Sequence, residues 1–304
     1  MGKCAVMKPI NPIIWVTKTK YEVLSPALIC KSEVGEKAFG LAALPSLWTL
    51  PFFVVSDDIL DEYRTGGNNL LAFGSWADSI KDASIACGIQ SNDPIIVRSN
   101  AHSEGLYERG KYISVEGFFN EWPFLIQQCF EELSKEAAGA KIKMPLIIQK
   151  RAKPLLRGHI SNERRVAQEI RDWKGEIDTS FPQIFSVSLR RWRSELNVSA
   201  FIDSSLICPS DKEIKDVLTI PCTWATNQKI RVHFEWIFDG EHIYIVQADE
   251  AVASEEIDPT KTSVCVKPTE NSDKSITFKC LHLLKEKDYE IQKFRTHYYT
   301  RNSD

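Results

Sequence analysis

The segment from Arg231 to Glu250, RVHFEWIFDGEHIYIVQADE, combines an acid on one predicted strand with a glutamine on the next. Its Asp-Gly pair predicts a turn between the strands but leaves the loop length open. A three-residue loop, Phe238 to Gly240, places the oxygen ligands Glu235 and Gln247 on one polar face, and a two-residue loop separates them. Their neighbours on that face are Arg231 and His233, and the apolar face consists of Val232, Phe234, Trp236, Tyr244 and Val246. An ordinary hairpin with a solvated polar side has the same pattern, so the shared face is a hypothesis.

Four other segments carry polar residues beside short apolar runs. PIIVRSN (94–100) predicts a buried strand that ends at Arg98, and PLIIQK (145–150) predicts another that ends at Gln149. VGEKAFGLAALP (34–45) predicts a helix with Lys37 in its first turn. LPFFVVSDDIL (50–60) predicts a strand followed by a helix that Ser56 caps. Each segment is weak evidence alone, and the order of all five is more informative.

In this order the five segments resemble the nucleotide-binding domain of the pyruvate phosphate dikinase, phosphoenolpyruvate synthase and rifampin phosphotransferase family. That family carries a G-G-K-G-x-N-L helix start, then L-P-x-P-x-G-F-V-x-T, V-R-S-S, V-V-V-Q and finally D-x-E-W-x-x-x-G-x-x-Y-x-L-Q-x-R. The resemblance covers about residues 30 to 250 of this chain. It implies an α+β fold of the ATP-grasp type, in which two lobes clasp ATP with Mg²⁺.

The resemblance also implies a role for each matching residue. Lys37 and Arg98 are the catalytic cations that contact the phosphates, and Gln149 borders the adenine. Glu235 binds Mg²⁺, and Gln247 completes the metal or phosphate side. Two of these assignments have plain alternatives: Lys37 as a charge on a helix surface, and Arg98 as the structural partner of a buried acid.

The phosphate loop of the family, S-F-A-G-Q-Q-x-T, corresponds here to YERGKYIS (107–114). The match keeps Gly110 and a hydroxyl at Ser114. It also gains two cations, Arg109 and Lys111, which we expect to face the same phosphates. The resemblance therefore adds Gly110, Lys111 and Ser114 to the residues expected to bind the nucleotide.

Two further positions depart from the family pattern. His233 replaces an acidic metal ligand, and neutral imidazole is a poor ligand for Mg²⁺, which prefers oxygen. Asp249 replaces an arginine that neutralises the transferred phosphoryl group, so the local charge is inverted. Both changes favour an alternative function, a nucleotide-sensing regulatory module that has lost catalysis.

The acceptor of the phosphate is not evident in the sequence. None of the six histidines lies in the T-x-S-H-A type of motif on which the family carries phosphate, so we expect no acceptor domain within these 304 residues. We therefore expect the nucleotide half of an ATP-dependent phosphotransferase, with a histidine or small acceptor supplied by another domain or chain. An ATP-grasp ligase is a third possibility, for which no substrate signature is visible.

Length, composition and charge limit the classes of partner and site that we expect. The 304 residues suffice for two lobes with separate cores, and the net charge of -3 gives no general attraction to nucleic acids. The eight cysteines include no C-x-x-C pair and no histidine at ligand spacing, so we expect no zinc site and reduced thiols, as in the cytoplasm. Neither a signal peptide nor a stretch of transmembrane length is apparent, so no membrane partner is expected.

The domain boundaries follow from the motifs. Residues 1–146 are expected to form an N-terminal lobe with the phosphate-binding loop, and 147–250 a C-terminal lobe with the adenine hinge and the metal-binding hairpin. Residues 251–304 form a C-terminal extension of different composition. Apolar spacing predicts a long helix from Phe118 to Leu133 in the first lobe, and a second helix is expected near Glu163 to Trp173.

Overall fold

The computed structural model describes residues 6–67, 70–100, 114–136, 144–163, 170–177, 183–188, 195–198, 211–250, 266–270 and 276–280. The chain divides into two compact units. The N-terminal unit comprises Met7–Pro154 and Tyr244–Asp249, and the C-terminal unit comprises Leu155–Ile243 with Met1–Val6 and Glu250–Asp304. Helices and β-sheets occur in both, so the predicted α+β class is confirmed.

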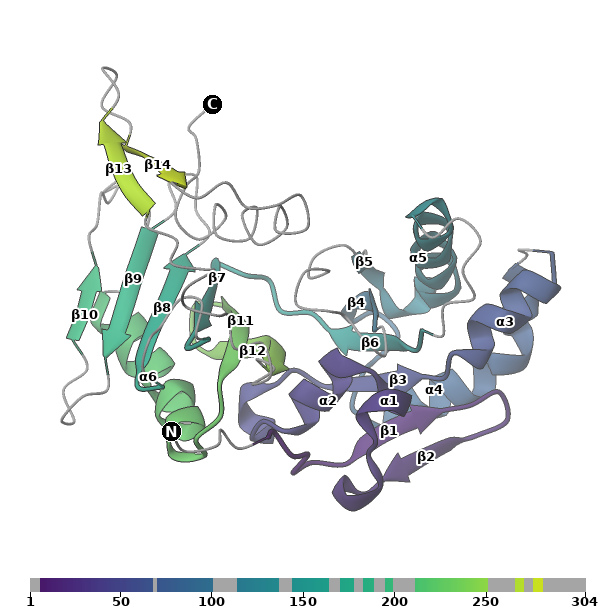
Figure 1. The fold of residues 1–304 in the computed structure, drawn as a ribbon. Helices are drawn as coiled ribbons and strands as arrows, with labels where there is room; N and C mark the ends of the chain where they lie inside the picture. Colours follow the sequence, from purple (N-terminus) through teal and green to yellow (C-terminus); the bar gives the residue numbers. More distant parts are fainter. Residues whose placement is uncertain are drawn as a thin grey trace. The chain divides into compact units, whose positions relative to one another are not determined.

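The N-terminal unit is built on a mixed six-stranded sheet with the strand order β2-β1-β3-β6-β4-β5 (Figure 1). Strand β1 pairs in parallel with β3, and the other neighbours are antiparallel. Strand β6, which the motifs predict to belong to the second lobe, lies between β3 and β4 in this sheet. The strands are β1 Ile13–Val16, β2 Tyr21–Leu24, β3 Phe52–Val55, β4 Pro94–Ser99, β5 Ser114–Phe118 and β6 Leu146–Lys150.

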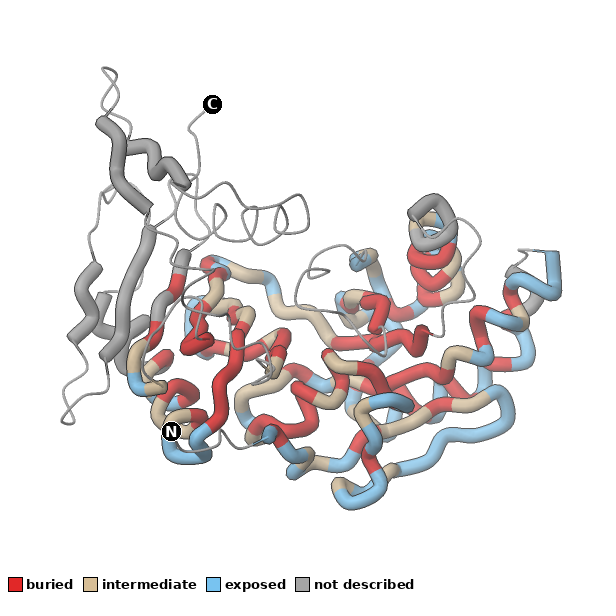
Figure 2. Tube along the Cα trace, viewed as in Figure 1, coloured by how far each residue is buried: buried red, intermediate tan, exposed pale blue. Residues whose placement is uncertain are grey.

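One face of this sheet carries the larger core, which α3 (Asp58–Thr65), α4 (Ala77–Ala86) and α5 (Trp122–Glu136) cover. Phe53 and Val97 both pair with Ile148 across neighbouring strands, so the three side chains share this face, and all three are fully buried. Figure 2 colours the trace by burial. Helix α5 confirms the predicted amphipathic helix. It begins four residues later than Phe118 because that residue ends β5 and 119–121 form a 3-10 turn.

The opposite face is covered by two short helices, α1 (Lys31–Val34) and α2 (Glu36–Ala42). Ala38 and Ala42 of α2 pack with Val54 of β3 and Ile147 of β6. These small alanine side chains allow the helix backbone to lie close to the strands. As a result, the first turn of α2 lies near the end of β4, where the polar residues gather.

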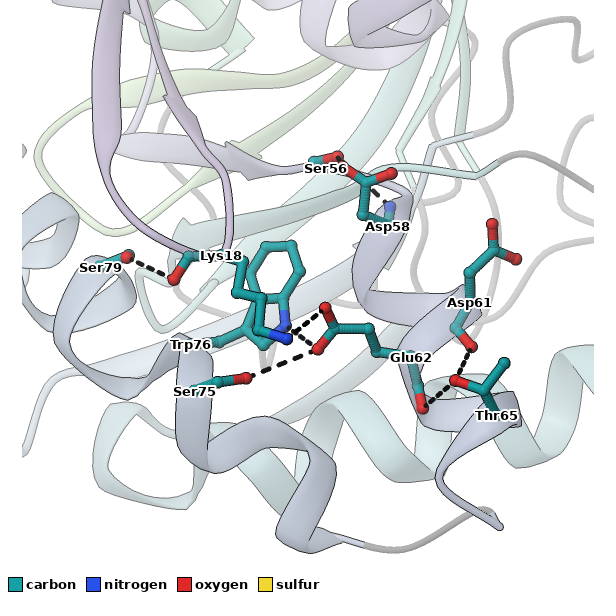
Figure 3. Close-up of polar contacts among 9 residues, drawn as sticks. All are labelled: Lys18, Ser56, Asp58, Asp61, Glu62, Thr65, Ser75, Trp76 and Ser79. Carbon is teal, nitrogen blue, oxygen red and sulfur yellow. Dashed lines mark hydrogen bonds and ion pairs between the residues drawn. The ribbon is translucent and has the colours of Figure 1, made fainter.

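A polar network ties the loop after β1 to the helices of the large core (Figure 3). Glu62 of α3 accepts a hydrogen bond of 3.0 Å from the indole of Trp76 and pairs with the Lys18 ammonium at 2.8 Å. Ser79 of α4 donates to the Lys18 carbonyl. Burial raises the pKa of Glu62, but its bonds to Lys18, Trp76 and Ser75 outweigh that effect, and the pKa lies below its ordinary value.

In the sheet with the strand order β10-β9-β8-β7-β11-β12, strands β7 to β11 belong to the C-terminal unit, whereas Tyr244–Asp249 of β12 belong to the N-terminal unit. Trp173 of β8 stacks on Phe234 of β11 with ring centroids 5.8 Å apart, and its indole donates to Thr226 of α6. The helix predicted near Glu163 to Trp173 is therefore wrong at its end, because Trp173 fills a sheet core, whereas residues 164–169 lie outside the described residues. The elements are β7 Leu156–Ser161, β8 Asp172–Ile177, β9 Gln183–Ser188, β10 Glu195–Val198, α6 Asp211–Asn227, β11 Val232–Phe238 and β12 Ile243–Glu250.

A separate two-stranded antiparallel sheet pairs β13 (Val266–Glu270) with β14 (Ile276–Cys280). These strands are the described part of the predicted C-terminal extension. Among the helices that the structure describes, none has the length and apolar character needed to span a membrane.

Candidate functional site

The loop of the β11–β12 hairpin is one residue longer than the three-residue loop that would place Glu235 and Gln247 on one polar face. Four residues, Asp239 to His242, separate the two strands. The carboxylate of Asp239 accepts hydrogen bonds from the backbone N–H groups of Glu241 and His242, and Gly240 takes a φ of 111°. The side chain of Asp239 therefore organises an even-numbered turn, and the predicted three-residue loop is wrong.

The side chains of β12 alternate accordingly. Ile243 and Ile245 are the deeply buried apolar residues, with 8% and 1% of their surface exposed. Gln247 follows them on the same side of the strand, because successive side chains point to opposite faces. Tyr244 and Val246, which were expected on the apolar face, are only half-buried. The alternation of β12 therefore gives no support to the prediction that Gln247 shares a polar face with Glu235.

Lys37 is held at the end of β4. Its ammonium donates a hydrogen bond of 3.1 Å to the Ser99 carbonyl, and its backbone N–H donates to the side-chain oxygen of Asn100 at 3.0 Å. Asn100 also donates to the carbonyl of Val34, so it bridges the residues on either side of Gly35. Only 7% of Lys37 is exposed, which rules out the alternative that it is a charge on a helix surface. Sequence reasoning missed Asn100, for which a polar residue at a strand end is the only signal.

Arg98, Ser114 and Gln149 lie on one face of the N-terminal sheet. Arg98 pairs with Ser114 on one side and with Ile147 on the other, and cross-strand partners share a face. Gln149 follows Ile147 by two residues and so projects to the same side. Because Ile147 packs with α2, this is the face that α2 covers. Arg98 and Gln149 are buried, whereas Ser114 is exposed.

The segment Tyr244–Asp249 belongs to the same unit and contacts the same residues. The guanidinium of Arg98 donates a hydrogen bond of 2.6 Å to the carbonyl of Val246. The amide of Gln247 donates to the Asp249 carboxylate at 2.8 Å, and these two side chains are 4% and 7% exposed. A buried acid thus stands at the position where the resembling family has a phosphate-neutralising arginine.

The structure accordingly gathers five of the expected site residues in the N-terminal unit: Lys37, Arg98, Ser114, Gln149 and Gln247. Gly110 and Lys111 of the expected phosphate loop lie outside the described residues, as does Arg109. Glu235 belongs to the C-terminal unit.

Glu235 lies in a cluster with two histidines on neighbouring strands. His159 of β7 lies directly opposite Glu235 of β11, and His233 precedes Glu235 by two residues. Nδ1 of His159 and Nε2 of His233 are 3.4 Å apart, and one potential ligand atom from each of the three residues lies within 4.8 Å of the other two. His233 is buried, whereas His159 and Glu235 are half-buried. Sequence reasoning missed His159, because its position 74 residues before His233 carries no local signal.

Comparison with protein-family models and with curated protein sequences finds no match for this chain. The chemistry of the residues themselves therefore indicates what each unit can bind. The N-terminal unit places Arg98 and the amide of Gln149 on one sheet face and a second cation, Lys37, at the end of β4, an arrangement suited to an anion. The C-terminal unit places two imidazoles and one carboxylate together, an arrangement suited to a metal ion.

Proposed function

We propose that the chain binds ATP in an ATP-grasp type of fold, with Lys37 and Arg98 contacting the phosphates and Gln149 bordering the adenine. The observation that supports this is that Arg98 of β4 and Gln149 of β6 share one face of a single sheet, while the Ser99 carbonyl holds the ammonium of Lys37 from α2 at the end of β4. Ser114 lies directly opposite Arg98 and adds a hydroxyl donor. Cations and hydroxyl donors fixed on a rigid sheet are what phosphate binding requires.

A side-chain hydrogen-bond donor on this face of the sheet suits a nucleotide. Within the described part of the chain, the buried side-chain N–H₂ of Gln149 has no hydrogen-bond partner. A buried donor left unsatisfied costs about 1–3 kcal/mol, so a ligand atom that accepts from it recovers that free energy. Ring nitrogens of adenine are acceptors of this kind.

The surroundings of Glu235, the expected Mg²⁺ ligand, suit Mg²⁺ poorly. Mg²⁺ selects oxygen ligands, and Glu235 has two imidazole nitrogens beside it instead of a second carboxylate. Mg²⁺ bound to the nucleotide phosphates can accompany ATP without a dedicated set of protein ligands. The proposal therefore keeps ATP with Mg²⁺ as the ligand and assigns no catalytic step to a metal held by Glu235 and Gln247.

The activity that the site supports best is phosphoryl transfer from ATP to a histidine or small acceptor carried by another domain or chain. Its rival is a nucleotide-sensing module with weakened catalysis. The buried Gln247–Asp249 pair favours the rival, because a carboxylate near a transferred phosphoryl group repels the charge that catalysis has to stabilise. Binding of ATP is common to both, and turnover separates them.

Thermal unfolding of the full chain with and without ATP and Mg²⁺ tests the proposal. A ligand that binds only the folded state stabilises it by about 2.7 kcal/mol at a hundredfold excess over its dissociation constant. We expect this gain in the wild type and its loss in Arg98→Ala and Lys37→Met. Arg64→Ala removes an arginine of α3 whose side chain is 36% exposed, and it serves as the matched control that keeps the gain. An unchanged melting temperature with saturating ATP, ADP, AMP and GTP would reject nucleotide binding.

A further inference from the structure

The cluster of His159, His233 and Glu235 is positioned by strand register alone. Strands β7 and β11 are antiparallel neighbours, and His159 is the direct cross-strand partner of Glu235. His233 and Glu235 are two residues apart on β11, so their side chains leave the same face. Three potential ligands thus converge from two adjacent strands of one unit, on a hydrogen-bonded scaffold that holds them without a loop.

The distance between the two imidazoles matches a shared metal ion better than a direct hydrogen bond. Bonds of about 2.0–2.1 Å from zinc to two histidine nitrogens in tetrahedral geometry place those nitrogens about 3.3–3.4 Å apart. Nδ1 of His159 and Nε2 of His233 are 3.4 Å apart. A direct hydrogen bond between nitrogen and its acceptor is usually about 2.7–3.2 Å long. Glu235 has the longest and most flexible side chain of the three, so its carboxylate can close the remaining distance.

The chemical types of the three ligands indicate which metal ion the cluster would bind. Two imidazoles and one carboxylate suit zinc and its first-row neighbours, whereas Mg²⁺ and Ca²⁺ select sets of oxygen ligands. Three protein ligands leave the fourth tetrahedral position to water or to an oxygen of a bound molecule, the arrangement of zinc sites that carry out chemistry.

We propose that His159, His233 and Glu235 form a binding site for a divalent transition metal, with Zn²⁺ as the reference ion. The site revises the expectation that the chain has no zinc site, which considered only ligands close together in the sequence. It is independent of the proposed nucleotide function, because all three ligands belong to one strand pair of the C-terminal unit.

Metal titration of the full chain, freed of metal by a chelator and without nucleotide, tests this proposal. Co²⁺ is the probe, because its visible absorption is intense in four-coordinate sites and weak in octahedral ones. We expect one Co²⁺ per chain with the four-coordinate spectrum, displaced by Zn²⁺ and retained in a large excess of Mg²⁺. Absence of that spectrum, or displacement by Mg²⁺ as readily as by Zn²⁺, would overturn the proposal.

Two ligand variants and one control variant test the assignment. His159→Gln and Glu235→Gln change half-buried side chains, and each is expected to weaken Co²⁺ binding by more than the roughly 10- to 100-fold that loss of an outer-shell partner costs. His242→Gln changes an exposed histidine of the β11–β12 turn and should leave the affinity unchanged. Circular dichroism checks that the variants fold. Undiminished Co²⁺ binding in a folded His159→Gln or Glu235→Gln protein contradicts the assignment, whereas ATP stabilisation should persist in both.

Discussion

The guanidinium of Arg98 donates a hydrogen bond to the carbonyl of Val246, which lies 148 residues further along the chain. The bond joins β4 to the segment Tyr244–Asp249 within the N-terminal unit. Arg98 is only 9% exposed, so its charge is stabilised by the protein more than by water. The residue that we propose as a phosphate contact is therefore also a structural one.

Replacement of Arg98 should consequently lower stability even without ligand. We expect Arg98→Ala to reduce the free energy of unfolding by about 1.5–3 kcal/mol, the usual contribution of a hydrogen bond from a charged group. Urea denaturation of the wild type, Arg98→Ala and the exposed control Arg64→Ala measures this loss. The ATP effect should then be taken as the shift within each variant. A folded Arg98→Ala protein as stable as the wild type would show that the bond to Val246 contributes nothing.

Asp249 is the residue on which the two proposed functions differ. In a dry phosphate site a misplaced charge is worth several kcal/mol, so the wild type should bind ATP and turn it over slowly. Asp249→Arg should raise any transfer rate, as measured by phosphate release and ATP/AMP exchange. Asp249→Asn serves as the control that removes the negative charge without adding a cation. Brisk wild-type turnover that falls in Asp249→Arg would show that other cations have rebuilt the site and that the sensor function is wrong.

Gly40 lies against the backbone of the β12 segment. A methyl group at Gly40 would overlap the carbonyl of Ala248, and a backbone group cannot move aside as a flexible side chain can. We expect Gly40→Ala to destabilise the protein by about 1–3 kcal/mol, the usual cost of overpacking. Gly74→Ala is the matched control, because a methyl group there meets nothing within 4 Å. Equal melting temperatures for the two variants would argue against this packing.

The change of folding stability with pH in the acid range should depend on Glu62. Its pKa in the folded protein is below the ordinary value of 4.5, so its ionised form favours folding above that pH. This contribution is lost as the pH falls through the lowered pKa of the folded state. The stability difference between wild type and Glu62→Gln should therefore be largest near neutral pH and shrink on acidification. Asp82→Asn, which changes an exposed acid of α4, serves as the control and should show a smaller difference at neutral pH. A Glu62→Gln difference that grows on acidification would contradict the network in Figure 3.

Several elements follow from local sequence alone. The strand Phe52–Val55 agrees with the structure, and Ser56 accepts a hydrogen bond from the backbone N–H of Asp58, although Asp57 rather than Ser56 is the N-cap of α3. The helix that starts at Glu36 and the one that covers β4 and β5 were likewise predictable. Apolar spacing and capping chemistry act over a few residues, so a sequence window contains the information that they need.

Other elements depend on packing that a sequence window cannot contain. Trp173 lies in a strand because it stacks on Phe234 and donates to Thr226, residues more than fifty positions away. Helix α6 contains Pro221, a residue that local rules treat as a helix breaker. Tertiary contacts thus outweigh local preference at Trp173, and the local rule also fails at Pro221.

The sequence by itself identified Lys37, Arg98, Ser114, Gln149 and Gln247 as candidates, since each stands in a motif of ordered segments. Only the tertiary structure decided that Lys37 is buried and bound to Ser99, and that a four-residue turn sets the alternation of β12. Only the register of β7 against β11 brought His159 beside Glu235. The physical reason is that strand pairing joins residues by hydrogen bonds between backbones. Those bonds are the same for any side chains, so a sequence alone does not state which residues will face each other.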